Sequence, residues 1–273
     1  MQKGGVGKTA TAIGLGDDLA HNGIPTVIVD LCHTGQSTAH LLGTAFFHEF
    51  AAEYGMDPDA NMANYMLRRW DGDISDLAIQ RDENLWIMPC AVETTTLSES
   101  LQMERFREER LVVALGDLPQ KAVVIVDTPP VLNYSTDNAL VACAGKKNAQ
   151  GADQQFGGTI LCPELVKASL TTQDMLFKQC KSLETGTQYE IRHLGWFASE
   201  TEENSVVNKE ARGILDAAGL RRLGEMPRRT AIEKARNGGK TLREYISPKD
   251  EHNKVALDRW AELGKIVREE LHV

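Results

Sequence analysis

The residues best suited to chemistry form a glycine-rich stretch at the start of the sequence, where a lysine and a threonine close a run of glycines. Residues 3–9 read Lys-Gly-Gly-Val-Gly-Lys-Thr. Glycines let successive backbone N–H groups point at phosphate oxygens, and a following helix adds the positive end of its dipole. In such a loop Lys8 reaches the β- and γ-phosphates, while the Thr9 hydroxyl is a ligand of Mg²⁺. The stretch predicts a phosphate-binding loop made of Gly4, Gly5, Val6, Gly7, Lys8, Thr9 and Ala10.

The alternative interpretation is a glycine-rich turn that only caps a helix. Gly7-Lys8-Thr9 stands directly before a run with apolar residues at helical spacing, among them Ile13, Leu15 and Leu19. That placement favours the phosphate loop, because the helix start is where the loop's N–H groups and the helix dipole act on the same anion.

The elements that position this loop follow from an alternation of short β-branched runs with longer helical stretches. This pattern predicts an α/β fold with a mostly parallel central sheet, in which several strands are apolar throughout because both faces are covered. We expect strands at residues 26–30, 85–89, 122–127, 159–163 and 191–198. We expect helices at residues 8–22, 95–116, 166–183, 203–218 and 253–271.

Length and composition exclude several classes of protein. The chain has 273 residues, 42% hydrophobic and 25% charged, which is ordinary globular composition and long enough for a sizeable core. No apolar run approaches the ~18–20 residues of a membrane span, and no membrane partner is expected. The cysteines form no CxxC pair or metal-ligand spacing, so we interpret them as reduced, buried side chains: Cys32, Cys90, Cys143, Cys162 and Cys180.

Residues 1–273 are expected to form one domain, because no repeat and no long linker interrupts the pattern. Two stretches are predicted to be loops or insertions. Residues 44–82 are acidic and interrupted, and residues 145–158 are polar and rich in glycine and glutamine.

The form of the glycine-rich loop departs from the general GxxxxGK[ST] pattern, since Gln2 stands where that pattern has glycine. With Lys3 before the double glycine, it resembles the deviant P-loop of the ParA/MinD superfamily of P-loop ATPases. The resemblance implies the three-layer P-loop fold, bound ATP and Mg²⁺, and a nucleotide-sandwich homodimer. In that dimer, Lys3 reaches across to the phosphates bound by the partner.

Three further segments carry the resemblance in the family's order. Residues 27–30 with 35–38 are similar to its second strand and first switch, and residues 124–130 (Val-Ile-Val-Asp-Thr-Pro-Pro) to its Walker B strand and second switch. There Asp127 would hold Mg²⁺ through water. Met226-Pro227-Arg228, followed by Glu233 and Ala235, is similar to the segment that lines the adenine pocket of partition ATPases.

Gln2 before Lys3 is typical of the partition (ParA/Soj-like) branch, and the absence of a CxxC pair disfavours the iron–sulfur branches. The C-terminal residues 260–271 are acidic and interrupted by Gly264, so they are interpreted as core packing rather than as a MinD-type membrane helix.

Charge is unevenly distributed along the chain. The formal net charge is −9, yet residues 205–243 hold ten basic and four acidic residues. Such a segment can contact a phosphate backbone, and solvated side chains with internal salt bridges are the alternative. The candidate DNA contacts are Arg212, Arg221 and Arg222.

Two departures from the family's pattern affect function. The first switch reads Asp30-Leu31-Cys32-His33, so Cys32 stands where the family has the aspartate near the attacking water. Loss of an orienting group can lower hydrolysis by orders of magnitude, and ATP binding is therefore better supported than turnover. The family also has a strand before the P-loop, and from the sequence we expect that strand to be missing through truncation.

The resemblance thus implies a cytoplasmic, nucleoid-associated partition protein. It would dimerise with ATP, bind DNA nonspecifically and respond to a ParB-like partner, with Lys3, Lys8 and Asp127 supporting hydrolysis. Two alternatives remain open: a nucleotide-gated DNA-binding regulator with little hydrolysis, and a MinD-like positioning ATPase.

Overall fold

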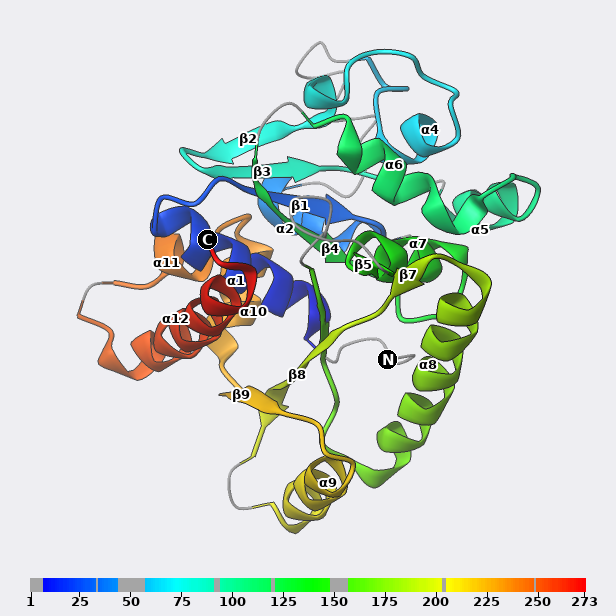
Figure 1. Ribbon diagram of the computed structural model, residues 1–273. Coiled ribbons are helices and arrows are strands. Elements are labelled where there is room, and N and C mark those ends of the chain that lie inside the picture. The colour runs from blue at the N-terminus through cyan, green and yellow to red at the C-terminus, as the bar shows by residue number, and fades with distance from the viewer. Residues whose placement is uncertain are drawn as a thin grey trace.

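The central sheet of the computed structural model lies between two groups of helices (Figure 1). The structure describes residues 7–32, 34–43, 57–90, 94–118, 121–147, 157–202, 205–247 and 249–273. A four-stranded part has the order β2 (Ile79–Asp82), β3 (Leu85–Met88), β1 (Thr26–Asp30) and β4 (Val123–Asp127), in which β2 alone is antiparallel to its neighbour. A three-stranded parallel part has the order β6 (Thr159–Leu161), β8 (His193–Thr201) and β9 (Arg222–Pro227). The predicted α/β fold with a mostly parallel sheet is therefore confirmed.

Within the described residues, β4 is hydrogen-bonded to β1 and β6 to β8, so the two parts of the sheet do not share a ladder. One apolar cluster nevertheless spans both parts. It combines Val123 and Ile125 of β4 with Ile160 of β6 and Phe197 of β8. The expectation of a missing strand before the P-loop concerns chain outside these residues and stays a prediction.

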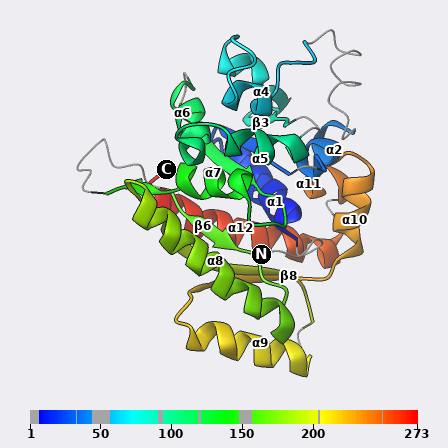
Figure 2. The same ribbon diagram turned by 90° about the vertical axis from the view of Figure 1, so that its right-hand side faces the viewer.

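Helices cover both faces of the sheet. On one face, α1 (Lys8–His21) packs along α12 (Glu251–Leu271), and both views show the two helices side by side (Figures 1 and 2). Their apolar residues join β8 and β9 in one cluster, whose members include Leu19, Phe197 and Trp260. The other described helices on this face are α2 (Gln36–Leu42), α10 (Thr230–Asn237) and α11 (Leu242–Tyr245).

The opposite face carries α5 (Thr94–Gln102), α6 (Arg110–Gly116), α7 (Tyr134–Ala142), α8 (Lys167–Gly186) and α9 (Val206–Ala217). Apolar side chains of β1 and β3 pack under α5, α6 and α7, and those of β8 pack under α7, α8 and α9. Figure 2 shows α9 at the far end of α8, at the edge of the molecule.

Most predicted elements are observed within a few residues of their expected ends, but two predictions are wrong. The helix expected over residues 95–116 is broken into α5, the 3-10 helix η2 (Arg107–Glu109) and α6. The break includes Phe106, whose φ of 52° is left-handed backbone that a right-handed helix cannot contain. The loop expected over residues 145–158 begins with a strand, β5 (Gly145–Lys146), which pairs with β7 (Tyr189–Glu190).

The other predicted insertion, residues 44–82, contains regular structure in its described part. It holds α4 (Met62–Met66), the 3-10 helix η1 (Ile74–Leu77) and strand β2. Buried Met62, Met66, Ile74 and Leu77 join the core under β1 and β3. Apolar burial therefore outweighs the acidic composition of this stretch.

Candidate nucleotide-binding site

The start of α1 is built to leave its N-terminal N–H groups for an anion. Gly7 is the N-cap, with a left-handed φ of 82°. No side chain of the described residues caps the helix, and its first turn holds no acidic residue. A Cβ at Gly7 would lie 2.3 Å from the Cβ of Ser199 on β8, so only glycine fits. The unsatisfied N–H groups and the positive end of the helix dipole together favour a phosphate group here.

Asp127, at the carboxyl end of β4, lies beside the first turn of α1. Its Oδ2 accepts hydrogen bonds from Thr9 Oγ1 at 2.7 Å and from Ser37 Oγ at 2.6 Å. Its Oδ1 is buried and has no hydrogen-bond partner among the described residues. A buried carboxylate with one unpartnered oxygen next to a threonine hydroxyl is a donor set that suits Mg²⁺.

A second buried carboxylate, Asp30, ends the neighbouring strand and lies in register with Asp127. Burial, followed by the negative charge of Asp127, raises the pKa of Asp30 to about 7. Burial also raises the pKa of Asp127, although the hydrogen bonds from Ser37 and Thr9 and the charge of Lys8 oppose that shift. Two desolvated carboxylates at one sheet edge repel each other, so a cation here would relieve the repulsion.

Asp30 also folds the loop after β1 back onto the site. Its Oδ2 accepts from the backbone N–H and the hydroxyl of Thr38, both at 2.8 Å, and its Oδ1 accepts from the Cys32 N–H at 3.0 Å. Both ends of the loop are therefore fixed to one carboxylate. Sequence reasoning placed Asp30, Ser37 and Thr38 in segments similar to the family's second strand and first switch but gave none of them a role of its own. A carboxylate at the end of a buried strand was a signal that could have found Asp30.

Cys32 is buried in this loop, and its Sγ lies 3.1 Å from Thr34 Oγ1. Burial raises the pKa of the thiol, so Cys32 is uncharged at neutral pH and does not replace the charge of a carboxylate. His33 lies outside the described residues.

The structure brings together some of the predicted site residues. Gly7, Lys8, Thr9 and Ala10 form the start of α1, and Thr9 contacts Asp127. Lys3, Gly4, Gly5 and Val6 lie outside the described residues.

The predicted adenine-pocket segment begins at the end of β9. Pro227 is the last residue of that strand and Arg228 follows it as an exposed residue. Ala235 on α10 is 1% exposed and belongs to the apolar core, whereas Glu233 is exposed. The role of this segment in binding adenine stays a prediction.

The three candidate DNA contacts each hold an ion pair within the molecule. Arg212 donates two hydrogen bonds of 2.7 Å to the carboxylate of Glu225, which Arg222 also contacts at 2.7 Å. Arg221 pairs with Glu270 of α12. Glu225 is shared by two arginines, and Glu270 also pairs with Arg192, so these ion pairs compensate only part of the positive charge. The side chains of Arg221 and Arg222 remain about half exposed.

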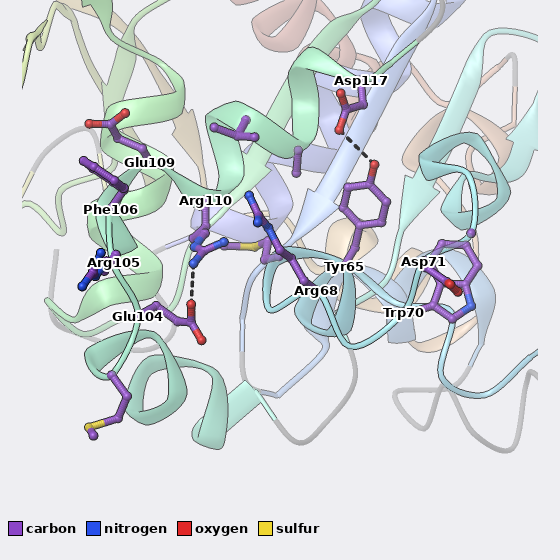
Figure 3. Close-up of a pocket in the computed structure, with 15 residues that line it drawn as sticks. Tyr65, Arg68, Trp70, Asp71, Glu104, Arg105, Phe106, Glu109, Arg110 and Asp117 are labelled. Carbon is purple, nitrogen blue, oxygen red and sulfur yellow. Dashed lines mark hydrogen bonds and ion pairs between the residues drawn. The ribbon is translucent and has the colours of Figure 1, made fainter.

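A separate hollow of about 950 Å³ lies between the segment after α4 and the η2–α6 region (Figure 3). Tyr65, Trp70 and Phe106 line it together with both acidic and basic side chains. None of the residues that surround Asp127 lines this hollow, so it is distinct from the candidate nucleotide site.

Comparison with known proteins gives the context of this site. A family model described as an AAA domain matches residues 1–145. The sporulation initiation inhibitor protein Soj of Bacillus subtilis (strain 168) is 33% identical over 144 residues, which is 52% of each chain. The chain belongs to the ParA/MinD-like P-loop ATPases.

The chain spans about half the length of the curated relatives that it matches. Solved structures cover more of it at lower identity and show the fold. A putative plasmid partition protein of Borrelia burgdorferi B31 bound to AMPPNP has a TM-score of 0.74 at 19% identity, covering 98% of this chain and 95% of that one. An ATP complex of a Cyanothece McdA variant has a TM-score of 0.75 at 18% identity, covering 100% and 94%. Among the described residues, no helix is both long and apolar enough to cross a membrane.

Proposed function

We propose that this chain is a partition-type ATPase that binds ATP with Mg²⁺ at the start of α1. The observation that carries the proposal is the convergence of Thr9, Ser37 and Asp127 beside an uncapped helix N-terminus. Lys8 and the N–H groups of α1 would hold the phosphates, while Thr9 and Asp127 would hold the metal ion. Bound Mg²⁺ would neutralise part of the charge on the phosphates.

In this proposal ATP joins two copies of the chain, and Lys3 contacts the nucleotide of the partner copy. The ATP-bound dimer binds DNA without sequence preference, and a ParB-like partner stimulates hydrolysis and release. The protein acts in the cytoplasm, associated with the nucleoid. The family membership and the Borrelia partition protein support this proposal.

In this proposal the DNA-contacting surface consists of α10 and the residues that flank it. Arg228, Lys234, Arg236 and Lys240 are exposed, and no ion pair involves them within the described ranges. Glu233 is the acidic residue of this helix. Arg212, Arg221 and Arg222 are already paired with carboxylates. Unpaired cations release more counterions when they bind DNA than paired cations do.

The test is binding to a fluorescent duplex DNA of arbitrary sequence, measured by anisotropy with ATPγS, ADP or no nucleotide. The proposal predicts salt-sensitive binding with ATPγS that is at least tenfold tighter than with ADP. Equal affinity in all three conditions, or no binding at low salt, would contradict the partition function while leaving nucleotide binding open.

A second candidate function is a nucleotide-gated DNA-binding regulator that hydrolyses ATP very slowly. The specific observation that favours it is the buried, uncharged thiol of Cys32 at the family's aspartate position. The two functions share the nucleotide site and differ in turnover, so the Cys32 substitution described below separates them.

A further inference from the structure

Ser37 contacts Asp127, but the proposed function gives a role toward the metal ion only to Thr9 and Asp127. Its hydroxyl donates to Asp127 Oδ2 at 2.6 Å, and both residues are buried. Thr9 donates to the same oxygen at 2.7 Å. Asp127 thus receives one hydroxyl from α1 and a second one from α2, and both occupy the same side of the carboxylate.

The surrounding bonds fix Ser37 in this position. It is the second residue of α2, a helix that begins after Gly35 in left-handed backbone with φ 55°. The next residue, Thr38, donates twice to Asp30, which also accepts from the Cys32 N–H. The bonds from Thr38 hold the backbone next to Ser37, which keeps the Ser37 hydroxyl within reach of Asp127.

Two donors on one oxygen define the orientation of the carboxylate and leave the other oxygen free. Asp127 Oδ1 is buried, and within the described structure it has no hydrogen-bond partner. A buried acceptor without a partner is costly unless a ligand satisfies it. Partners that orient a metal-binding carboxylate usually affect metal affinity strongly.

We propose that Ser37 is a positioning residue for Mg²⁺, which holds Asp127 so that its free oxygen is available to the metal ion's hydration shell. This inference rests on the proposed nucleotide site. The contact that orients Asp127 comes from Ser37 at the start of α2, so the inference links the start of this helix to metal binding. A Ser37 variant should therefore lose affinity for Mg²⁺ rather than for the nucleotide.

The experiment measures binding of a fluorescent ATPγS analogue in EDTA and across a titration of Mg²⁺. For Ser37→Ala we expect the Mg²⁺ concentration at half-maximal effect to rise about tenfold. The affinity in EDTA should stay within about twofold of wild type. Ser37→Thr and Ser37→Val add the same bulk, but only threonine keeps a hydroxyl. Of these two variants, only Ser37→Val should lose the Mg²⁺ response.

Ser75→Ala is the matched control, because the Ser75 hydroxyl also donates to a carboxylate, that of Asp73, at 2.6 Å on an exposed segment. It should bind Mg²⁺ and nucleotide as wild type does.

Each outcome decides a separate point. If wild type shows no binding that depends on Mg²⁺, the proposed function itself is wrong. If wild type responds to Mg²⁺ and Ser37→Ala responds identically, only the inference about Ser37 is overturned. Equal losses in EDTA and in Mg²⁺, equal behaviour of the threonine and valine variants, or a lower Mg²⁺ requirement in Ser37→Ala also overturn it.

Discussion

At the scale of single residues, the chemistry of the site depends on charges that the fold buries. Asp30 and Asp127 end neighbouring strands in register, and their carboxylates are almost fully buried. Cys32 adds a neutral thiol beside these carboxylates. The site therefore has acidic groups suited to a cation, and the resemblance to the family predicts that Cys32 replaces the aspartate near the attacking water.

Replacing Cys32 by aspartate tests this account of slow turnover. Cys32→Asp should raise steady-state ATP hydrolysis by at least about tenfold, because an ionised carboxylate can orient the attacking water. Release of inorganic phosphate, measured with DNA present, is the readout. Cys32→Ser removes the thiol without adding charge, so its hydrolysis of ATP should stay slow. Cys180→Ala removes a buried thiol elsewhere and should hydrolyse ATP equally slowly.

Equal rates in Cys32→Asp and Cys32→Ser would contradict this role for the position. Fast hydrolysis by the wild-type protein would exclude the slow regulator instead.

At the scale of elements, α10 carries exposed basic side chains, whereas α7 carries buried polar residues. The exposed basic residues of α10 contrast with the paired arginines near α9 and β9. Sequence alone could locate the excess of positive charge in residues 205–243 but not the pair of Arg221 with Glu270, which are far apart along the chain. Ion pairing across the fold decides which charges remain free.

Charge removal on α10 tests that assignment. The double variant Lys234→Gln/Arg236→Gln should weaken DNA binding and reduce the slope of log affinity against log salt by about two. Arg221→Gln should change the slope by less than half as much, since its charge is already paired with Glu270. Anisotropy titrations between about 50 and 200 mM salt measure both, and a larger loss for Arg221→Gln would contradict the assignment.

Helix α7 follows the Asp127-Thr-Pro-Pro segment and carries a buried layer of polar residues. Asn138 joins it to its neighbours by accepting from the Leu111 N–H at 2.9 Å and donating to the Arg107 carbonyl at 2.6 Å. Asp137 accepts from Gln179 of α8 at 2.8 Å. Burial raises the pKa of Asp137 from 3.8 to about 6, against the opposing effect of that hydrogen bond.

This raised pKa gives a pH dependence of stability with a defined sign. Between about pH 4 and pH 6 the folded protein keeps a proton on Asp137 that the unfolded chain has lost, so stability falls as pH rises through this window. Asp137→Asn should therefore raise the free energy of unfolding by about 1–3 kcal/mol at pH 7.5 and by roughly a third as much near pH 4.5. Urea denaturation at the two pH values checks this.

The exposed Asp216, replaced in the same way, serves as the control. A gain from Asp137→Asn that is equal at both pH values would show that titration of this carboxyl is not its cause.

At the scale of the whole molecule, periodicity and β-branched runs were sufficient to predict the sheet and its largest helices. The break in residues 95–116 was not predictable, because it includes the left-handed backbone of Phe106, a residue with no special preference for that conformation. Strand β9 and helix α7 were also missed. β9 contains Arg222, Gly224 and Glu225 instead of a continuous apolar run, and α7 is rich in buried polar residues.

The part of the candidate site that forms a continuous sequence motif was predictable. The contacts that folding assembles from distant residues were not. The sequence of residues 3–9 predicts the phosphate loop by itself, and Asp127 follows an apolar strand. The contact of Ser37 with Asp127 joins residues 90 positions apart. It requires the register of β1 with β4 and the hydrogen bonds that Asp30 accepts from Cys32 and Thr38, neither of which a motif encodes.

The central claim is that the start of α1 and Asp127 form a site for ATP and Mg²⁺. The most direct measurement is equilibrium binding of a fluorescent ATPγS analogue to wild type and to Lys8→Ala, with and without Mg²⁺. We predict one saturable site per chain, tighter binding with Mg²⁺, and at least about tenfold weaker binding in a folded Lys8→Ala variant. Absence of saturable binding to wild type, or equal affinity in the two proteins, would contradict the account.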